Sequence, residues 1–531
     1  MRTGSPARRV VVSSSVAIAL ALASVLVPSP VSAASVIRVD TVTDAMSTDG
    51  HCSLREAVQA ANAGSPVDTC AAHPGANIID LPAGHFTIAI PGHDENFDAT
   101  GDFDITSDLT IRGASAARTV IDGAGLERVF EVFGGAHVRL ARMTITGGDS
   151  TDVGFKSNGG GIANFGYLTV DHARVIGNTA GPEGAGGGIF NTGALTLLHT
   201  TVADNSVVQG GGGGISSSGS AFLTDVKVIG NTAASLSNEA SRDSAGQAAG
   251  IDSSGYLEID RSLVAENHGN GEWTDGGITM QHGIVRATTI RDNTASDCGS
   301  GGIVMVRALM VRSTVSGNSG GECDGTGGVV AMDSRIVNST ISGNSSGDGH
   351  GEPGGSMRVG GILSDHSTIV SSTITDNVNA LLTTDGGPGP AGLLVSGLPT
   401  SWVSGGATIV RGTIVAGNTD VNGAAWDCGG TVTSGGHDLF GATRGCTISS
   451  VPTDLLGVDP KLGPLADNGG PTLTQMPLVG SPAIDGWSVG GGSAAGCPRA
   501  DQRGVRRPQD GDGNGHPFCD IGSVEVARPR R

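Results

Sequence analysis

Two carboxylates stand at equivalent places in neighbouring repeats of this sequence. Glu266 and Asp292 each come directly before an asparagine of a recurring phrase. If successive repeats stack as parallel strands, their backbones lie about 4.8 Å apart. That spacing is near the roughly 5–5.5 Å between the carboxyl groups of a retaining glycosidase, which makes the two residues a candidate catalytic pair. We favour the alternative, a turn position, because Asp204, Asp376 or a glycine stands there in the other repeats.

A second group of polar residues lies near the C-terminus. Asp510, Asp512 and Asn514 alternate with glycine, like the first ligands of a calcium-binding loop. The twelfth position of that loop would be Ile521 instead of glutamate, which excludes an EF-hand. A simpler Ca²⁺-stabilised turn stays open, and no cofactor is required. The histidines are scattered, without the spacing of metal ligands.

The elements that would hold these groups repeat with a period of about 26 residues. An apolar residue, two variable residues and an asparagine recur nine times, and a small-Gly-Ile phrase alternates with them. The recurring asparagines are Asn178, Asn205, Asn231, Asn267, Asn293, Asn318, Asn344, Asn377 and Asn418. Between the two phrases, apolar and polar residues alternate over three to five positions, which predicts short strands.

Repeats made only of strand and turn indicate one coil each of a parallel β-helix. A leucine-rich horseshoe is the main rival, but its leucine-rich signature is missing, and a propeller blade needs about 40 residues. We therefore predict an all-β fold, a right-handed parallel β-helix solenoid with an N-terminal capping helix and an irregular C-terminal cap. The nine asparagines would form a structural ladder along one turn, because stacked amides hydrogen-bond along the axis.

The eight cysteines fall in sequential pairs, which we expect to be disulfides. The pairs are Cys52–Cys70, Cys298–Cys323, Cys428–Cys446 and Cys497–Cys519. Cys298 and Cys323 each lie five residues after a ladder asparagine, so stacking would place them about 4.8 Å apart, within disulfide range. Spacing alone does not fix the other three pairings.

The N-terminus predicts export. Arg8 and Arg9 precede a mostly apolar stretch, and small residues at 31–33 suit cleavage of a signal peptide over 1–33; a membrane anchor is the alternative. The formal net charge of −20 argues against nucleic acid and anionic lipid, and against a polyanionic substrate unless a local basic groove exists. We expect a secreted, extracellular monomer with no transmembrane segment in the mature chain.

Residues 52–63 have the pattern of an amphipathic helix, with Ser53 and Glu56 as a capping box, and we place this helix over the N-terminal mouth. The phrase Cys-Ser-Leu-Arg-Glu-Ala at 52–57 resembles the signature of the CSLREA-domain family of secreted bacterial proteins. Phrases at 459–465, 468–472, 480–485 and 519–522 resemble the choice-of-anchor Q domain. The resemblance implies an extracellular right-handed β-helix and no defined catalytic residues.

These features divide the chain into four parts. We expect a signal peptide at 1–33, a CSLREA-like cap with the first strands at 34–92, the parallel β-helix at 93–450 and a choice-of-anchor Q-like region at 451–531. The favoured function is non-enzymatic binding or organisation of extracellular or cell-wall glycans. The alternative is a polysaccharide lyase or glycoside hydrolase acting along the loop edge. Aromatic residues make up only 3% of the chain, which counts against an extended sugar-stacking groove.

Overall fold

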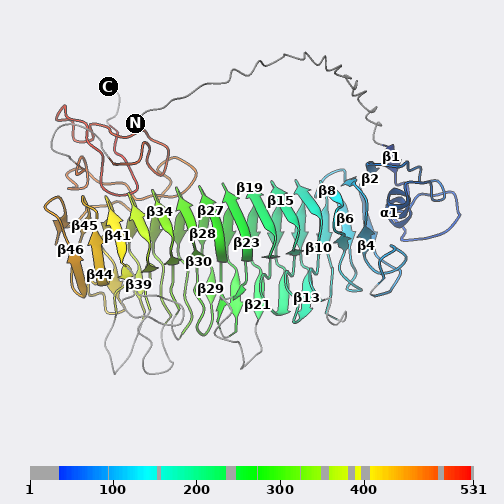
Figure 1. Cartoon of the computed structure of the whole chain (residues 1–531), viewed down its shortest axis with the longest axis horizontal. Helices are drawn as coiled ribbons and strands as arrows, with labels where there is room; N and C mark the ends of the chain where they lie inside the picture. The colour runs from blue at the N-terminus through cyan, green and yellow to red at the C-terminus, as the bar shows by residue number, and fades with distance from the viewer. Residues whose placement is uncertain are drawn as a thin grey trace, which may run out of the picture. The chain divides into compact units, whose positions relative to one another are not determined.

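The computed structural model describes residues 35–93, 95–151, 157–234, 247–271, 273–322, 325–347, 358–380, 389–395, 407–487 and 496–527. In these residues the chain is a right-handed parallel β-helix, which confirms the predicted fold class (Figure 1). A 24-stranded sheet and a 14-stranded sheet form two faces, and a 5-stranded sheet lies along a third. The strands of these sheets pair in parallel with their equivalents in the next coil.

One coil shows how the repeat becomes structure. Its strands are, in order, β10 (Ile162–Asn164) and β11 (Tyr167–Asp171) of the first sheet, β12 (Arg174–Ile176) of the second and β13 (Thr179–Pro182) of the third. A first turn at His172 joins β11 to β12, and a second turn at Asn178 joins β12 to β13. On either side of β11 in the sheet lie β8 (His137–Ala141) and β15 (Ala194–Leu198), and beyond β8 lies β5 (Leu109–Arg112).

The core is a stack of identical positions. The apolar residue of each small-Gly-Ile phrase pairs with its equivalent in the next coil. The stacked residues are Ile162, Ile189, Ile215, Ile251, Ile278, Ile303, Val329, Ile362 and Leu393, and each has 0% exposure. Burial of such a side chain contributes about 1.5–3 kcal/mol, so the stack supplies a large part of the stability.

The glycine of the same phrase explains why the two phrases recur together. A Cβ added at Gly188 would lie 2.7 Å from the carbonyl oxygen of Gly214 and 2.9 Å from Nδ2 of Asn205. The glycine therefore lies against a ladder asparagine across the interior of the coil. A larger residue would push the ladder away from the strands.

The N-terminal end is closed by the predicted helix. Helix α1 (Leu54–Ala63) begins at the N-cap Ser53, whose side chain accepts the N–H of Glu56, and the Glu56 carboxylate accepts the N–H of Ser53. The helix ends at Gly64, which is left-handed. It lies beside β4 (Phe103–Ile105) at the blue end of the molecule (Figure 1). No described helix is long and apolar enough to cross a bilayer.

The C-terminal region is irregular and folds back against the outside of earlier coils. Strand β47 (Leu455–Leu456) still pairs with β45 (Leu439–Phe440), so the second sheet continues past residue 450. Further on, Gln502 Nε2 donates to Thr314 Oγ1 at 2.9 Å, and Thr340 Oγ1 donates to Gln502 Oε1 at 2.7 Å. These buried contacts fix the region to the 14-stranded sheet.

Three of the four predicted disulfides lie within the described residues and are present. Cys52–Cys70, Cys428–Cys446 and Cys497–Cys519 have Cα–Cα distances of 5.1, 5.5 and 6.7 Å. Cys298 is also disulfide-bonded. Its expected partner Cys323 lies outside the described residues.

Candidate functional site

The second turn of the coil carries the asparagines as one continuous ladder. Each Nδ2 donates to Oδ1 of the asparagine in the next coil at 2.8–3.0 Å. Each backbone N–H donates to the same oxygen. After Asn418 the last acceptor is Asp427 Oδ1, at 2.8 Å from Asn418 Nδ2. The nine side chains are at most 1% exposed, and their hydrogen bonds hold the turn.

Glu266 and Asp292 occupy the slot directly before the ladder. Their φ angles are 57° and 54°, and Asp204, Asp376 and the glycines of this slot are left-handed too. Arg291 lies between the two candidates, with Nη1 3.6 Å from Glu266 Oε1 and bonded to the Asp292 carboxylate. The backbone conformation accounts for the recurrence of aspartate and glycine, which adopt it more readily than most residues. The geometry therefore favours the turn interpretation of this pair.

The candidate calcium turn contains a residue that the sequence pattern did not single out. Asp485 lies with Asp510 and Asp512, and one carboxylate oxygen of each is within 4.8 Å of the others. Burial and the facing carboxylates of Asp512 and Asp510 raise the pKa of Asp485. Asn514 instead donates from Nδ2 to Asp512 Oδ2 at 2.8 Å. Asp485 therefore takes the place of Asn514 in the candidate set of ligands, and calcium binding at this turn stays a prediction.

The first turn of the coil has a ladder of its own, built from hydroxyl groups. Backbone N–H groups donate to the hydroxyl oxygen of the next coil at 3.0–3.3 Å. The acceptors are Ser262, Thr288, Ser313, Ser339, Ser372 and Thr413. The last rung donates from Thr413 N to Asp438 Oδ1 at 3.0 Å, and burial raises the pKa of Asp438 to about 8. This turn thus ends in a carboxyl group, as the asparagine turn does.

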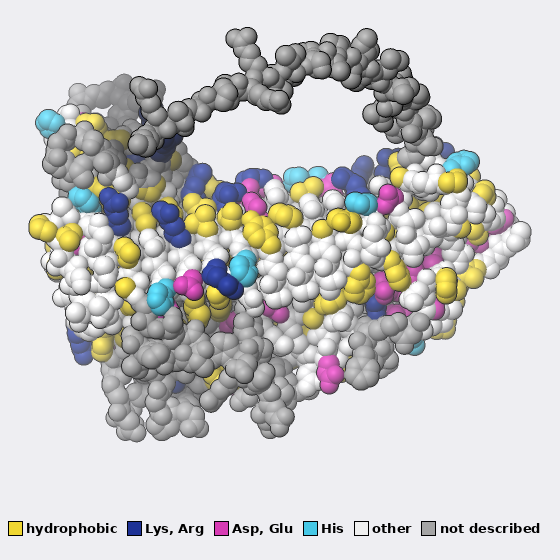
Figure 2. Space-filling model, viewed as in Figure 1, with side chains coloured by type: hydrophobic (Ala, Val, Ile, Leu, Met, Phe, Trp, Pro, Cys, Tyr) yellow, Lys and Arg dark blue, Asp and Glu magenta, His cyan; other side chains and the backbone are white. Residues whose placement is uncertain are grey.

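Charged side chains gather at this first turn. Figure 2 shows Lys, Arg and His side chains along the long edge where β8, β15 and β19 (Ser220–Thr224) end in Figure 1. A groove of about 700 Å³ opens there across the coils of β5, β8 and β11, and three of the residues that line it are Arg112, Arg139 and Arg142. Asp171 is the one acidic residue among the described residues that line it, so the groove is locally basic in a chain that is acidic as a whole.

The three arginines differ in how far their charge is already compensated. Arg112 donates from Nη2 to Asp80 Oδ2 at 3.0 Å, and Arg139 pairs with Asp171 Oδ2. Arg142 donates only to the carbonyl oxygen of Ala114, at 2.7 Å, and has no carboxylate partner among the described residues. Arg142 is exposed at the first turn, where φ is 59°. Its guanidinium is the part of the groove most available to an anion.

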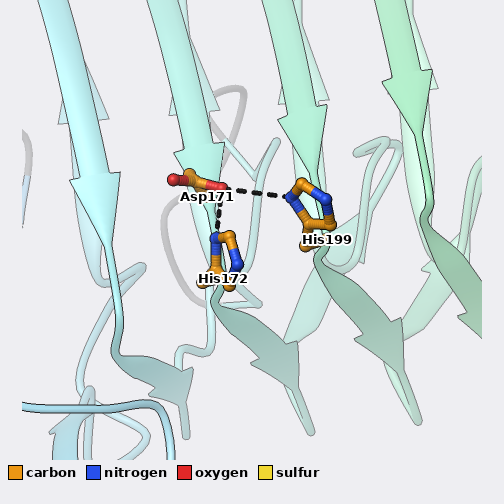
Figure 3. Close-up of side chains that lie close together, drawn as sticks. All are labelled: Asp171, His172 and His199. Carbon is orange, nitrogen blue, oxygen red and sulfur yellow. Dashed lines mark hydrogen bonds and ion pairs between the residues drawn. The ribbon is translucent and has the colours of Figure 1, made fainter.

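Asp171 and His172 line one end of the groove, and His199 lies beside them (Figure 3). Asp171 ends β11, His172 is the next residue, and His199 holds the equivalent turn position one coil later. His172 Nδ1 lies 2.6 Å from Asp171 Oδ1, and His199 Nδ1 lies 3.6 Å from the same oxygen. The rings stack with centroids 4.4 Å apart. When Nδ1 of His172 donates to Asp171, Nε2 carries the lone pair, which is the tautomer of a general base.

An aromatic pair continues the outer face of the same strands. Tyr167 on β11 stacks on His137 on β8, with ring centroids 4.3 Å apart and an interplanar angle of 1°. Tyr167 is 52% exposed. Arg139 follows His137 by two positions and therefore lies on the same face of β8. The groove thus borders a flat aromatic surface that suits stacking against a sugar ring.

The sequence analysis did not predict this groove, because its residues are far apart in the chain and belong to no common motif. Arg112, Arg142 and His172 lie about 30 residues apart in the chain. Only the coil register brings them side by side, through the pairings β5–β8 and β8–β11. Aligning the repeats at the first turn could have revealed the groove, because equivalent positions in successive coils are neighbours in space.

No protein-family model matches this chain, and no curated protein matches it. Solved structures with a similar fold include the Azotobacter vinelandii mannuronan C-5 epimerase AlgE4 A-module, at 12% identity and a TM-score of 0.35 over 78% of this chain and 96% of that chain. Pectate lyase Pel9A has 12% identity and a TM-score of 0.32 over 93% and 96%. The Dettilon tailspike protein has 15% identity and a TM-score of 0.33, over 72% of this chain and 62% of that chain.

Proposed function

We propose that this protein binds an acidic glycan, a polysaccharide carrying carboxylate or sulfate groups, in the groove at the first turn. The observation that carries the proposal is the cluster of Arg112, Arg139 and Arg142 on two neighbouring coils of a chain with net charge −20. Guanidinium groups bind carboxylate and sulfate through paired N–H donors. A local basic groove is the condition under which an acidic protein accepts a polyanion.

The geometry suits a polymer better than a small anion. Arg112 pairs in register with Ala141, and Arg139 pairs with Thr110. The groove therefore presents its arginine donors as a staggered row over two neighbouring coils, which are spaced by about 4.8 Å. Tyr167 and His137 offer a stacking surface beside that row. A ligand with repeated anionic groups and flat ring faces uses both features at once.

We place this binding outside the cell. The described disulfides are stable in an oxidising compartment. The predicted signal peptide at 1–33 lies outside the described residues, and export through it is part of the proposal. The resemblance of residues 52–57 to the CSLREA-domain family of secreted bacterial proteins also supports this placement.

The proposal is tested by measuring binding of the purified protein to polygalacturonate and alginate, with neutral dextran as comparison. We expect binding to the acidic polymers only, weakened by added salt because exposed charges are screened. Arg142→Ala should weaken it roughly tenfold or more, since a hydrogen bond to a charged group contributes about 1.5–3 kcal/mol. Arg335→Ala is the matched control, because Arg335 is exposed on β34 (Arg335–Val337) away from the groove. Equal binding of dextran, or no effect of Arg142→Ala, contradicts the proposal.

A second candidate function, a polysaccharide lyase, is favoured by the Asp171–His172 contact. His172 Nε2 would accept the proton next to the sugar carboxylate. The electrons of that C–H bond form a C=C bond, and the glycosidic oxygen leaves and takes up a proton. An arginine of the groove would neutralise the carboxylate. Unsaturated products that disappear in His172→Ala, with binding retained, would support the lyase; binding without products would support the non-enzymatic function.

A further inference from the structure

A second group of acidic residues is buried beneath the N-terminal helix. Asp98 and Asp104 are 0% exposed, Asp102 is 2% and Glu127 is 4%. Asp104 on β4 pairs across the sheet with Glu131 on β7 (Phe130–Val132) of the next coil. Burial of several carboxylates together is costly unless their charge is compensated.

The nearby cations do not balance these acids. Arg55 donates from Nη1 to Asp98 Oδ1 at 3.3 Å and also pairs with Asp44. Arg128 lies 3.6 Å from Asp102 through Nε and bonds Glu131 through Nη1. Among the residues that the structure describes, two guanidinium groups thus face the five carboxylates Asp98, Asp102, Asp104, Glu127 and Glu131, and His93 and Glu95 are further ionisable groups beside them.

Several carboxylate oxygens in this group accept no hydrogen bond from the described residues. They are Asp98 Oδ2, Asp102 Oδ2 and Asp104 Oδ1. Asp104 is the clearest case, because its other oxygen accepts the N–H of Asp98 at 3.1 Å while Oδ1 has no donor. A fully buried carboxylate oxygen without a donor is rare in a folded protein. One oxygen of Asp104 lies within 4.8 Å of an oxygen of Asp102 and of Glu131.

We propose that Asp102, Asp104 and Glu131 bind a calcium ion. Carboxylate oxygens are hard ligands, and the group contains neither the thiolate nor the imidazole of a zinc or copper site. Ca²⁺ accepts irregular sets of six to eight oxygens and gives up its water readily. Mg²⁺ requires near-octahedral geometry and retains several waters, which a site whose two aspartates, Asp102 and Asp104, are only 0–2% exposed does not favour.

The position of the site defines what the ion does. Arg55 of α1 donates to the carbonyl oxygens of Gly101 and Asp102, at 2.8 and 3.2 Å. Asp102 would bind the ion on the other side of the same segment, together with Asp104 of β4 and Glu131 of β7. Calcium would therefore fix the capping helix to the first two coils and close the N-terminal end of the solenoid.

Protonation is the competing way to neutralise the group. Burial raises the pKa values of Asp98 and Asp102 well above the usual range of an aspartate. Burial also raises the pKa of Asp104 to about 7. Calcium and protons compete for the same oxygens, so calcium should stabilise the protein at pH 8 and much less at pH 5.5. If protons alone neutralise the group, added calcium has no effect at either pH.

The experiment measures the thermal midpoint of the full-length secreted protein with millimolar CaCl₂ and with EGTA, and the heat of Ca²⁺ binding by calorimetry. We expect calcium to raise the midpoint at pH 8, with a dissociation constant on the order of 10⁻⁴ M, as in extracellular modules. Asp104→Asn should fold, since it removes one buried charge, and should bind calcium at least tenfold more weakly. Glu131→Gln is the second variant if Asp104→Asn does not fold.

The other acidic group supplies the matched control. Asp512→Asn changes the Asp485, Asp510 and Asp512 group and should leave the Asp104-dependent calcium effect intact. The proposal is overturned if wild-type protein shows no calcium-dependent midpoint at pH 8. It is equally overturned if Asp104→Asn and Glu131→Gln respond like wild type, or if the whole response disappears in Asp512→Asn.

Discussion

The turn that carries the asparagines and the turn that carries the arginines and histidines use the same backbone conformation. At the first turn, Arg142, His172 and His199 have φ angles of 59°, 50° and 48°. At the second turn, the slot before the ladder has 57° at Glu266 and 54° at Asp292. In both turns a left-handed residue is followed by a buried residue that hydrogen-bonds to the next coil.

The two turns differ in the residue that follows. An asparagine both donates and accepts, so each rung of its ladder has two bonds to the next coil, for example from Asn267 N and Nδ2 to Asn293 Oδ1 at 3.1 and 2.8 Å. A hydroxyl group accepts one such bond, for example from Thr288 N to Ser313 Oγ at 3.2 Å. The position after the left-handed residue therefore demands one residue type at the second turn, whereas the first turn tolerates several there.

The largest effect is expected from breaking the asparagine ladder in its middle. Asn293→Ala removes the acceptor of two donors of Asn267. The backbone N–H of Asn267 is left buried and unpaired, and Nδ2 keeps only its bond to the carbonyl oxygen of Val228. Each such loss costs about 1–3 kcal/mol, so the free energy of unfolding should fall by at least about 3 kcal/mol. Urea unfolding followed by circular dichroism measures it.

The control for that variant is the equivalent change in the hydroxyl ladder. Ser313→Ala leaves one donor unpaired, the N–H of Thr288, and should cost about 1–2 kcal/mol. Equal losses in Asn293→Ala and Ser313→Ala would show that the two turns are not distinguished by their ladders.

An intermediate effect is expected at the carboxyl group that ends the hydroxyl ladder. Burial raises the pKa of Asp438 to about 8, so the folded state keeps a proton that the unfolded chain loses near pH 4. Its contribution to stability is complete below about pH 4 and is lost as the pH rises through 8. Asp438→Asn should therefore reduce the fall in unfolding free energy between pH 5.5 and 8 by at least about 1 kcal/mol.

Thermal midpoints of wild type and Asp438→Asn, measured at both pH values in EGTA, test this expectation. Other carboxyl groups with raised pKa values, such as Asp520 and Glu525, contribute with the same sign in both proteins. Parallel pH profiles in the two proteins would mean that Asp438 is ionised in the folded state.

The smallest effect is expected in the slot before the asparagine ladder. Asp292→Gly keeps the left-handed turn, because glycine occupies the same slot at Gly317 with φ 67°. Stability should change by no more than about 0.5 kcal/mol, and binding of acidic glycans should be unchanged. A loss of turnover or binding would instead return Glu266 and Asp292 to the candidate catalytic residues.

These differences also explain what the sequence could predict. The asparagine ladder and the capping box of Ser53 and Glu56 need particular residue types, so both could be predicted from the sequence alone. The hydroxyl ladder could not, because Ala173, Thr200 and Ser262 hold equivalent places and share no single chemistry.

The buried acids escaped prediction for a different reason. Asp104 stands between Phe103 and Ile105, where alternation predicts an exposed side chain. All three residues are buried, because the preceding segment and Arg55 cover that face of the strand. Only tertiary packing reveals the burial.

The aspartates that end the two ladders, Asp427 and Asp438, bear on how the number of coils in such a solenoid can change. The bonds from one ladder asparagine to the next all run in one direction, from Asn178 towards Asn418, and Asp427 Oδ1 receives the last donors. Asp438 receives the last donor of the other ladder. Internal rungs present the same groups to both neighbours, so a whole coil can be duplicated or deleted between them without unmatched partners. Asp427 and Asp438 therefore end the two ladders, and a coil added between internal rungs would leave both of these ends unchanged.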